Sequence, residues 1–190
     1  MTAALIVIDM QHAFDDLDYW GPTTNPACEA NVARLVTTWA DAGDPIIVVR
    51  HDSNDPTSPL NPTHPGNALV APVAAAPAAA LITKNVNSAF YGTPDLAAVL
   101  EEHGIQDLVI CGIQTNMFVE TTARMGGNLG YNVTVVLDAT RTFDLETQIP
   151  GLGTVRRTAD ELMATTALVL QAGGFADTTP TEAGVGTPGS

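Results

Sequence analysis

Short apolar runs alternate with stretches of helical periodicity along most of the chain. Five runs rich in Val, Ile and Leu lack the apolar–polar alternation of half-exposed strands, which is typical of parallel strands covered on both faces. They are Ala4–Ile8, Pro45–Val49, Ala80–Thr83, Asp107–Cys111 and Val133–Leu137. The pattern predicts a three-layer α/β/α fold of the Rossmann-like type, with a mostly parallel sheet of about six strands.

Helices are predicted between these strands, at residues 25–42, 94–103, 115–129 and 154–172. Thr93 is expected to cap the second of them, with Pro94 at the first helical position, and Thr115 is expected to cap the third. This alternation of strands and helices predicts one domain over residues 1–177. The remaining residues, 178–190, are rich in Pro, Gly and Thr and are expected to form a mobile tail.

Charge narrows the possible partners. The 190 residues carry a net charge of −14, whereas binding to nucleic acid or to an anionic membrane needs clustered Lys and Arg. No run reaches the ~18 apolar residues of a membrane helix, and the N-terminal run is expected to be a strand and not a signal peptide. Two cysteines are too few for a disulfide framework, so we expect a cytoplasmic protein. Because the charge argues against nucleic acid and membranes, we expect the partner to be a small-molecule substrate.

Chemically useful side chains follow three of the predicted strands. Asp9 ends the first, Lys84, the only lysine in the chain, ends the third, and residues 111–115 lead from the fourth into a helix. In open α/β sheets, ligands bind beyond the carboxyl ends of the strands. Each residue also has a structural interpretation as a cap or an ion pair. Together they suggest a site for proton transfer and for stabilising an anion.

Three segments of the chain resemble the signature regions of the isochorismatase-like cysteine hydrolases, a family that includes nicotinamidases, N-carbamoylsarcosine amidohydrolase and isochorismatase. The segments are LIVIDMQHAF, ITKNVNSAFYGTPDL and LVICGIQTNMFVETTARMGGNLGYNVTVVLDAT. The resemblance covers about residues 3–175, and the spacing of the three segments fits the family as well as their content.

The resemblance implies an Asp–Lys–Cys triad. Asp9 matches the acid that accepts the thiol proton, and Lys84 matches the lysine that holds this acid. The pattern Gly-hydrophobic-x-Thr-x-x-Cys is here GIQTNMF, so Phe118 stands where the nucleophile should be. The family pattern also implies an oxyanion hole formed by the amides of Gln114 and Phe118, a cis peptide between Ile113 and Gln114, and assembly into a homo-oligomer.

Phe118 changes the expected activity, because phenylalanine cannot form a thioester. The other signature positions are intact, which suggests one recent or deliberate replacement of cysteine. Cys28 and Cys111 are expected to lie in the core. Nicotinamidases of the family carry an Asp-x-His with a further His nearby, and the spacing of His51, Asp52 and His64 breaks that pattern. We therefore expect no metal and no cofactor.

Aromatic residues in the loops after the first and third strands are candidate walls of a substrate pocket, with core packing as the alternative. They are Phe14, Trp20, Phe90 and Tyr91. Three functions remain open. The first is a scaffold for cleaving a small amide or carbamoyl C–N bond, impaired here by Phe118. The second is a vinyl ether hydrolase that uses Asp9 and Lys84 without a nucleophile, although Phe118 is bulkier than that chemistry favours. The third is a non-catalytic binding protein.

Overall fold

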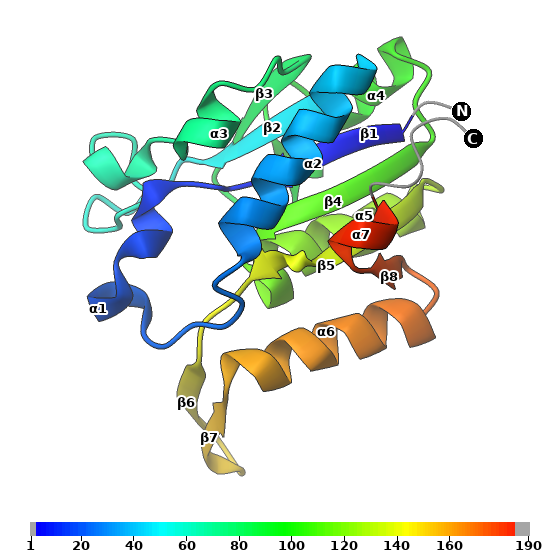
Figure 1. Ribbon diagram of the computed structural model, residues 1–190. Helices are drawn as coiled ribbons and strands as arrows, with labels where there is room; N and C mark the ends of the chain where they lie inside the picture. Colours follow the sequence, from blue (N-terminus) through cyan, green and yellow to red (C-terminus); the bar gives the residue numbers. More distant parts are fainter. Residues whose placement is uncertain (1–2, 185–190) are drawn as a thin grey trace.

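The computed structural model describes residues 3–184. Six parallel strands form one sheet in the order β3-β2-β1-β4-β5-β8, and helices cover both of its faces (Figure 1). The strands are β1 (Ala3–Ile8), β2 (Ile46–His51), β3 (Ala80–Lys84), β4 (Asp107–Ile113), β5 (Asn132–Arg141) and β8 (Asp177–Thr179). The predicted α/β/α architecture is confirmed.

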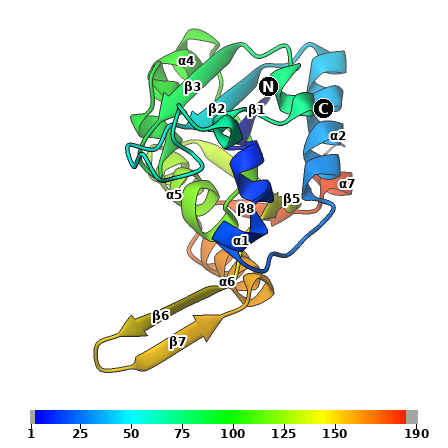
Figure 2. The same cartoon turned by 90° about the vertical axis from the view of Figure 1, so that its left-hand side faces the viewer.

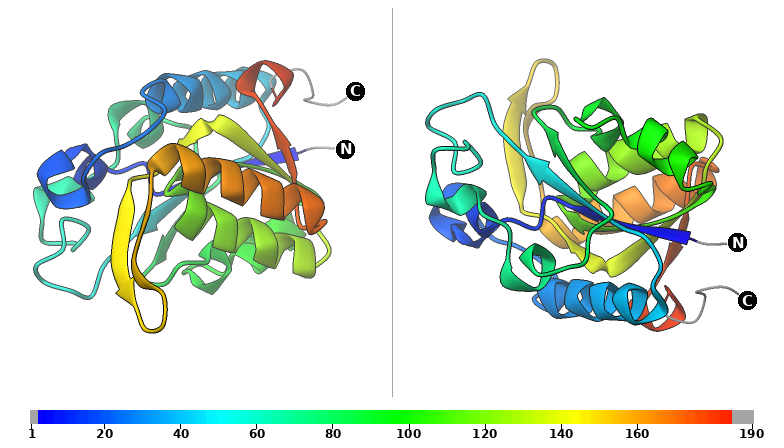
Figure 3. Two further views of the ribbon diagram at one scale, coloured as in Figure 1. Left: turned by 90° about the horizontal axis from the view of Figure 1, so that it is seen from below. Right: turned by 90° about the horizontal axis from the view of Figure 1, so that it is seen from above.

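Two groups of helices flank the sheet (Figure 3). On one face lie α2 (Cys28–Ala42), α3 (Ala71–Ala74) and α7 (Thr181–Gly184), and on the other lie α4 (Leu96–Glu102), α5 (Glu120–Asn128) and α6 (Ala159–Ala172). A short α1 (Leu17–Trp20) follows β1. Every residue of β1 is buried, as the apolar run predicts for a central strand. No helix among residues 3–184 has the length and apolarity needed to cross a membrane.

Some helix starts differ from the prediction. Asp95, not Thr93, caps α4 by accepting bonds from the amides of Ala97 and Ala98. Thr115 caps no helix: it opens a π-helical turn, Thr115–Val119, that precedes α5. Its hydroxyl instead donates to Oγ1 of Thr140 at 2.8 Å.

The prediction places the start of the last helix too early, at residue 154. Residues Gly153–Arg157 form β7, which pairs antiparallel with β6 (Leu145–Ile149) in a hairpin that stands apart from the main sheet. Helix α6 begins only at Ala159, where Thr158 and Glu161 form a capping box. The hairpin strands are almost entirely exposed. The hydrophobic pattern of the sequence therefore does not separate them from the helix that follows.

The expected tail is partly built into the domain. Thr178 and Thr179 pair with Val135 and Val136 of β5, and α7 follows after Pro180. The fully buried Thr181 is held by Oδ1 of Asp138, which accepts bonds from its amide and its hydroxyl, both at 2.6 Å. The expected domain boundary at residue 177 therefore falls inside an ordered strand, and residues 185–190 of the expected tail lie outside the described residues.

Candidate functional site

The order of the strands places the candidate site. From β1 the chain proceeds outward through β2 and β3, and it then returns to the other side of β1 for β4, β5 and β8. The topology therefore reverses between β1 and β4, and a crevice at the carboxyl ends of two such strands is the usual ligand site of open α/β sheets. Asp9 directly follows β1, and residues 114–118 directly follow β4.

Asp9 and Lys84 form an ion pair at this edge of the sheet. Nζ of Lys84 donates to Oδ2 of Asp9, and both side chains are fully buried. Asp9 adopts a left-handed backbone conformation, with φ of 50°, which is uncommon for a residue with a side chain and is often found at functional sites. The other carboxyl oxygen of Asp9, Oδ1, has no hydrogen-bond partner among the described residues.

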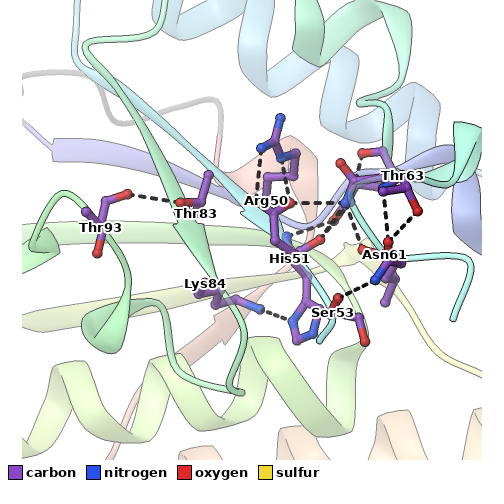
Figure 4. A network of polar contacts seen from close by, with 12 residues as sticks. Arg50, His51, Ser53, Asn61, Thr63, Thr83, Lys84 and Thr93 are labelled. Carbon is purple, nitrogen blue, oxygen red and sulfur yellow. Dashed lines mark hydrogen bonds and ion pairs between the residues drawn. The ribbon is translucent and has the colours of Figure 1, made fainter. Parts of the chain in front are cut away.

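His51 is a third member of this cluster. It is the last residue of β2 and lies in register with Lys84 of β3, and its Nδ1 is 3.1 Å from Nζ of Lys84 (Figure 4). The sequence indicates His51 only as part of a metal-binding pattern that its spacing breaks, and it does not predict the contact with Lys84. Its place at the end of a strand beside β3 is the signal that points to it, since parallel neighbours end at the same edge.

Burial governs the ionisation of all three groups. It raises the pKa of Asp9 to about 6, although Lys84 opposes the shift. Burial also lowers the pKa of Lys84, although Asp9 opposes that shift. The pKa of His51 falls to about 4, first because of burial and then because of the nearby ammonium group. His51 is therefore neutral at pH 7, and its Nδ1 accepts a hydrogen bond from Lys84.

Phe118 covers this cluster. It lies in the π-helical turn after β4, its ring stacks on that of His51 with centroids 5.0 Å apart, and the centroid is 4.2 Å from Nζ of Lys84. The ammonium group thus faces a carboxylate, an imidazole nitrogen and the face of an aromatic ring, which matches its three N–H donors. All four residues are buried, with exposed fractions of 0% for Asp9, 4% for Lys84 and 9% for both His51 and Phe118.

The segment between β4 and Phe118 is also buried. The peptide bond between Ile113 and Gln114 is cis, as the resemblance implies, and their exposed fractions are 1% and 5%. Gly112 has a φ of 121°, and a Cβ there would lie 1.9 Å from the carbonyl oxygen of Ile8. Glycine is therefore required where β4 lies against the backbone of Ile8 in β1.

The four aromatic residues expected around the substrate do not gather on one wall. Phe14 and Trp20 pack on each other and on Phe143, with centroids 4.9 to 6.1 Å apart. Phe90 stacks on Tyr131 at 5.7 Å. Tyr91 is 71% exposed and borders a cavity of about 500 Å³ that Asp52, Asn61 and Thr93 also line. Three of the four thus contribute to packing, and one lies at a cavity.

Polar groups that line this cavity form hydrogen bonds within the loop after β2 (Figure 4). Asn61 bonds to Ser53 and Thr63, while Asp52 accepts two bonds from Arg50, both at 2.9 Å. Hydrogen bonds from Arg50 help lower the pKa of Asp52. Within residues 3–184, no three His, Cys, Asp or Glu side chains are arranged to hold a metal ion.

Both cysteines lie in the core, as expected. Burial raises the pKa of Cys28 to about 12, and it raises the pKa of Cys111 well above the usual value of a thiol. Neither is suited to form the thiolate that nucleophilic attack requires.

Known proteins are similar to this chain in sequence and in fold. The family model for the isochorismatase domain matches residues 3–167. The isochorismatase-family protein YrdC of Bacillus subtilis (strain 168) is 38% identical over 145 residues, which are 76% of each chain. Nicotinamidase 3 of Arabidopsis thaliana is 30% identical over 157 residues, covering 76% of this chain and 75% of that protein.

A crystal structure of an isochorismatase-family hydrolase from Chromobacterium violaceum superimposes with a TM-score of 0.87. It has 38% sequence identity and covers 97% of this chain and 92% of that chain. The matched length therefore includes all the strands that carry the candidate site. The chain belongs to the isochorismatase family of hydrolases.

Proposed function

We propose that the chain is a scaffold for cleaving a small amide or carbamoyl C–N bond, in which Phe118 replaces the cysteine nucleophile, so that the chain is inactive or severely impaired. The observation that carries the proposal is the position of Phe118 over the buried Asp9–Lys84 pair. The similarity to a nicotinamidase supports an amide as the substrate class.

The chemistry that a cysteine at this position would perform follows from the geometry. Asp9 has one carboxyl oxygen without a partner, which is the natural acceptor for the thiol proton. The thiolate would attack the amide carbonyl carbon, and the oxyanion would accept hydrogen bonds from the amides of residues 114 and 118. Asp9 would then give its proton to the departing amine, leaving a thioester for water to cleave.

Phe118 prevents this reaction in two ways. Its ring has no nucleophilic atom, and it fills space beside His51 and Lys84 that the smaller side chain of a cysteine would leave open. A change at residue 118 is therefore expected to do more than add a thiol, because it also opens the cluster.

The test compares Phe118→Cys with Phe118→Ala, which opens the same space without a thiol. Ammonia release is measured on a panel of small primary amides and N-carbamoyl compounds, and intact mass spectrometry looks for an acyl adduct. We expect hydrolysis and an adduct with Phe118→Cys alone, and loss of hydrolysis in Phe118→Cys combined with Asp9→Asn. Equal and negligible activity of the Cys and Ala variants, without an adduct, would contradict the proposal.

The pKa of Asp9, raised to about 6, favours a second candidate, vinyl ether hydrolysis with Asp9 as the proton donor. This reaction needs no nucleophile, but it needs access to Asp9, whose side chain has no exposed surface. Turnover of isochorismate by the unmodified chain, abolished by Asp9→Asn, would favour this candidate over the first.

A further inference from the structure

The cavity that Tyr91 borders adjoins the buried cluster of the candidate site. It has a volume of about 500 Å³ and lies between the loop after β2 and the residues that follow β3. Figure 2 views the molecule from the side at which the parallel strands end, and this loop lies there. Lys84 is both a member of the buried cluster and part of the cavity wall. Small-molecule sites measure roughly 300 to 1,000 Å³, so the cavity has the size of such a site.

The wall of this cavity is polar. Apart from Pro62, every described residue that lines it carries a hydroxyl, an amide or a charged group. Most small-molecule sites are instead lined mainly by hydrophobic side chains. A ligand that fits this cavity therefore has a surface rich in hydrogen-bonding groups.

The charged groups of the wall are already paired. Both carboxyl oxygens of Asp52 accept hydrogen bonds from Arg50, and the side chain of Lys84 is fully buried against Asp9. The net charge of −14 repels anions. Among the described residues that line the cavity, no unpaired carboxylate is present to bind a cation and no exposed basic group to bind an anion. The matching ligand is neutral.

Hydrogen bonds hold one side of the wall in place before any ligand binds. Nδ2 of Asn61 donates to two backbone carbonyl oxygens of the loop, and its Oδ1 accepts from the amide and the hydroxyl of Thr63. Four other side chains of the wall are exposed and take no part in these bonds, namely Asn54, Asn85, Tyr91 and Thr93. The cavity thus combines a preorganised wall with amides and hydroxyls that can bond to a ligand.

Tyr91 adds an aromatic surface to these polar groups. It is 71% exposed, and tyrosine presents an apolar ring that ends in a hydroxyl. A sugar ring has the complementary features, since its C–H groups form a face that packs on an aromatic ring and its hydroxyls form a rim. Each hydroxyl both donates and accepts, as the amide of Asn85 does. A flat aromatic ligand has no such rim to bond to the exposed amides.

We propose that this cavity binds a sugar ring, which packs on Tyr91 and bonds to Asn85 and Thr93, and that this ring is part of the substrate. Nζ of Lys84 lies 4.2 Å from the centroid of the Phe118 ring, so Lys84 links the cavity to position 118. A sugar that carries a small amide or carbamoyl group places its hydroxyls in the cavity and its C–N bond toward that position. Sugar binding stands on the cavity alone, whereas its role as part of the substrate rests on the proposed function.

Binding is tested on the unmodified chain by saturation-transfer NMR with neutral hexoses at millimolar concentrations. We expect transfer to the C–H protons of the sugar ring. Tyr91→Leu and Asn85→Leu should each raise the dissociation constant by about fivefold or more. Tyr19→Leu is the matched control and should leave it unchanged, because Tyr19 is 52% exposed on α1 and does not line the cavity.

Charge and ring type are varied in the same experiment. The uronic acid and the amino sugar of the same ring should bind about fivefold more weakly or worse, because neither charge has a partner in the wall. Absence of transfer to every neutral hexose overturns the proposal, as does equal weakening by Tyr91→Leu and Tyr19→Leu. Tighter binding of a charged sugar or of nicotinamide than of the neutral sugars also overturns it.

The role in the substrate is tested on Phe118→Cys by ammonia release from N-carbamoylglycosylamines and from N-carbamoylalkylamines of similar size. We expect kcat/KM to be about tenfold higher or more for the sugar compounds, and Tyr91→Leu, but not Tyr19→Leu, to raise their KM. Equal kcat/KM for the two classes refutes the sugar as part of the substrate and leaves the C–N cleavage intact. Hydrolysis of neither class contradicts the proposed function, and sugar binding by the unmodified chain then decides the role of the cavity.

Discussion

The ammonium nitrogen of Lys84 lies 4.2 Å from the centroid of the Phe118 ring. Both residues are buried, and the contact joins the only lysine of the chain to the residue that stands at the expected nucleophile position. A residue that removes the proposed chemistry thus contributes to the packing of the same cluster. The contribution of this contact to the free energy of unfolding can be measured.

The contact between Lys84 and Phe118 should be worth about 2 kcal/mol, the magnitude of a desolvated cation–π pair. A double-mutant cycle of Phe118→Leu and Lys84→Met, followed by urea unfolding, isolates this term. The control cycle uses Arg124 and Phe175, which lie 4.6 Å apart. Because the side chain of Arg124 is 35% exposed, its coupling should be smaller. Equal coupling in the two cycles would refute the argument from burial.

The stability of the chain should respond to pH through two opposing groups. The folded-state pKa of Asp9 is raised from 3.8 to about 6, so its contribution is present below pH 4 and is lost as the pH rises through 6. The folded-state pKa of His51 is lowered from 6.5 to about 4, so its contribution is present above pH 6.5 and is lost as the pH falls through 4. Each amounts to roughly 3 kcal/mol.

Single substitutions should separate the two contributions. Relative to the unmodified chain, the free energy of unfolding of Asp9→Asn should increase with pH between 4 and 6.5, because the His51 contribution remains. In His51→Gln it should decrease with pH over the same range. Urea unfolding at several pH values measures both differences. Parallel profiles of all three chains would show that neither group titrates in this range.

Gly112→Ala should cost more than about 3 kcal/mol of folding free energy or prevent folding, because the new Cβ would overlap the backbone of Ile8. Gly104→Ala is the control. Gly104 also has a positive φ, of 63°, but has open space around its Cβ position, so its cost should be about 1 kcal/mol. Similar unfolding midpoints for the two variants would contradict the close approach of β4 to β1.

Thr181→Val tests whether the segment beyond residue 177 belongs to the domain. The substitution removes the buried hydroxyl that donates to Asp138 at 2.6 Å and should lower the free energy of unfolding by about 1 to 3 kcal/mol. Thr179→Val removes only a hydroxyl with a distant acceptor, at 3.4 Å, and should change stability little. An unfolding curve of Thr181→Val that matches that of Thr179→Val would argue against docking of this segment.

Local signals in the chain were enough for the central part of the fold. The five apolar runs correspond to β1–β5, and the strand-end positions of Asp9, Lys84 and Phe118 follow from those runs and from the connectivity of a parallel sheet. The hairpin and β8 were not predicted, because they lack such apolar runs. The hairpin strands are short and mostly exposed, and β8 is defined by its pairing with β5, which lies far from it in the sequence.

Periodicity and motif spacing thus establish which side chains reach the edge of the sheet, because strand length and parallel connection fix where each strand ends. Which of them touch is a long-range property. The stacking of His51 on Phe118, the unpartnered oxygen of Asp9 and the closure of the cluster depend on the strand order 3-2-1-4 and on the packing of side chains 30 to 75 residues apart in the sequence. Burial then sets the ionisation of the cluster, since desolvation is the largest cause of each shift there.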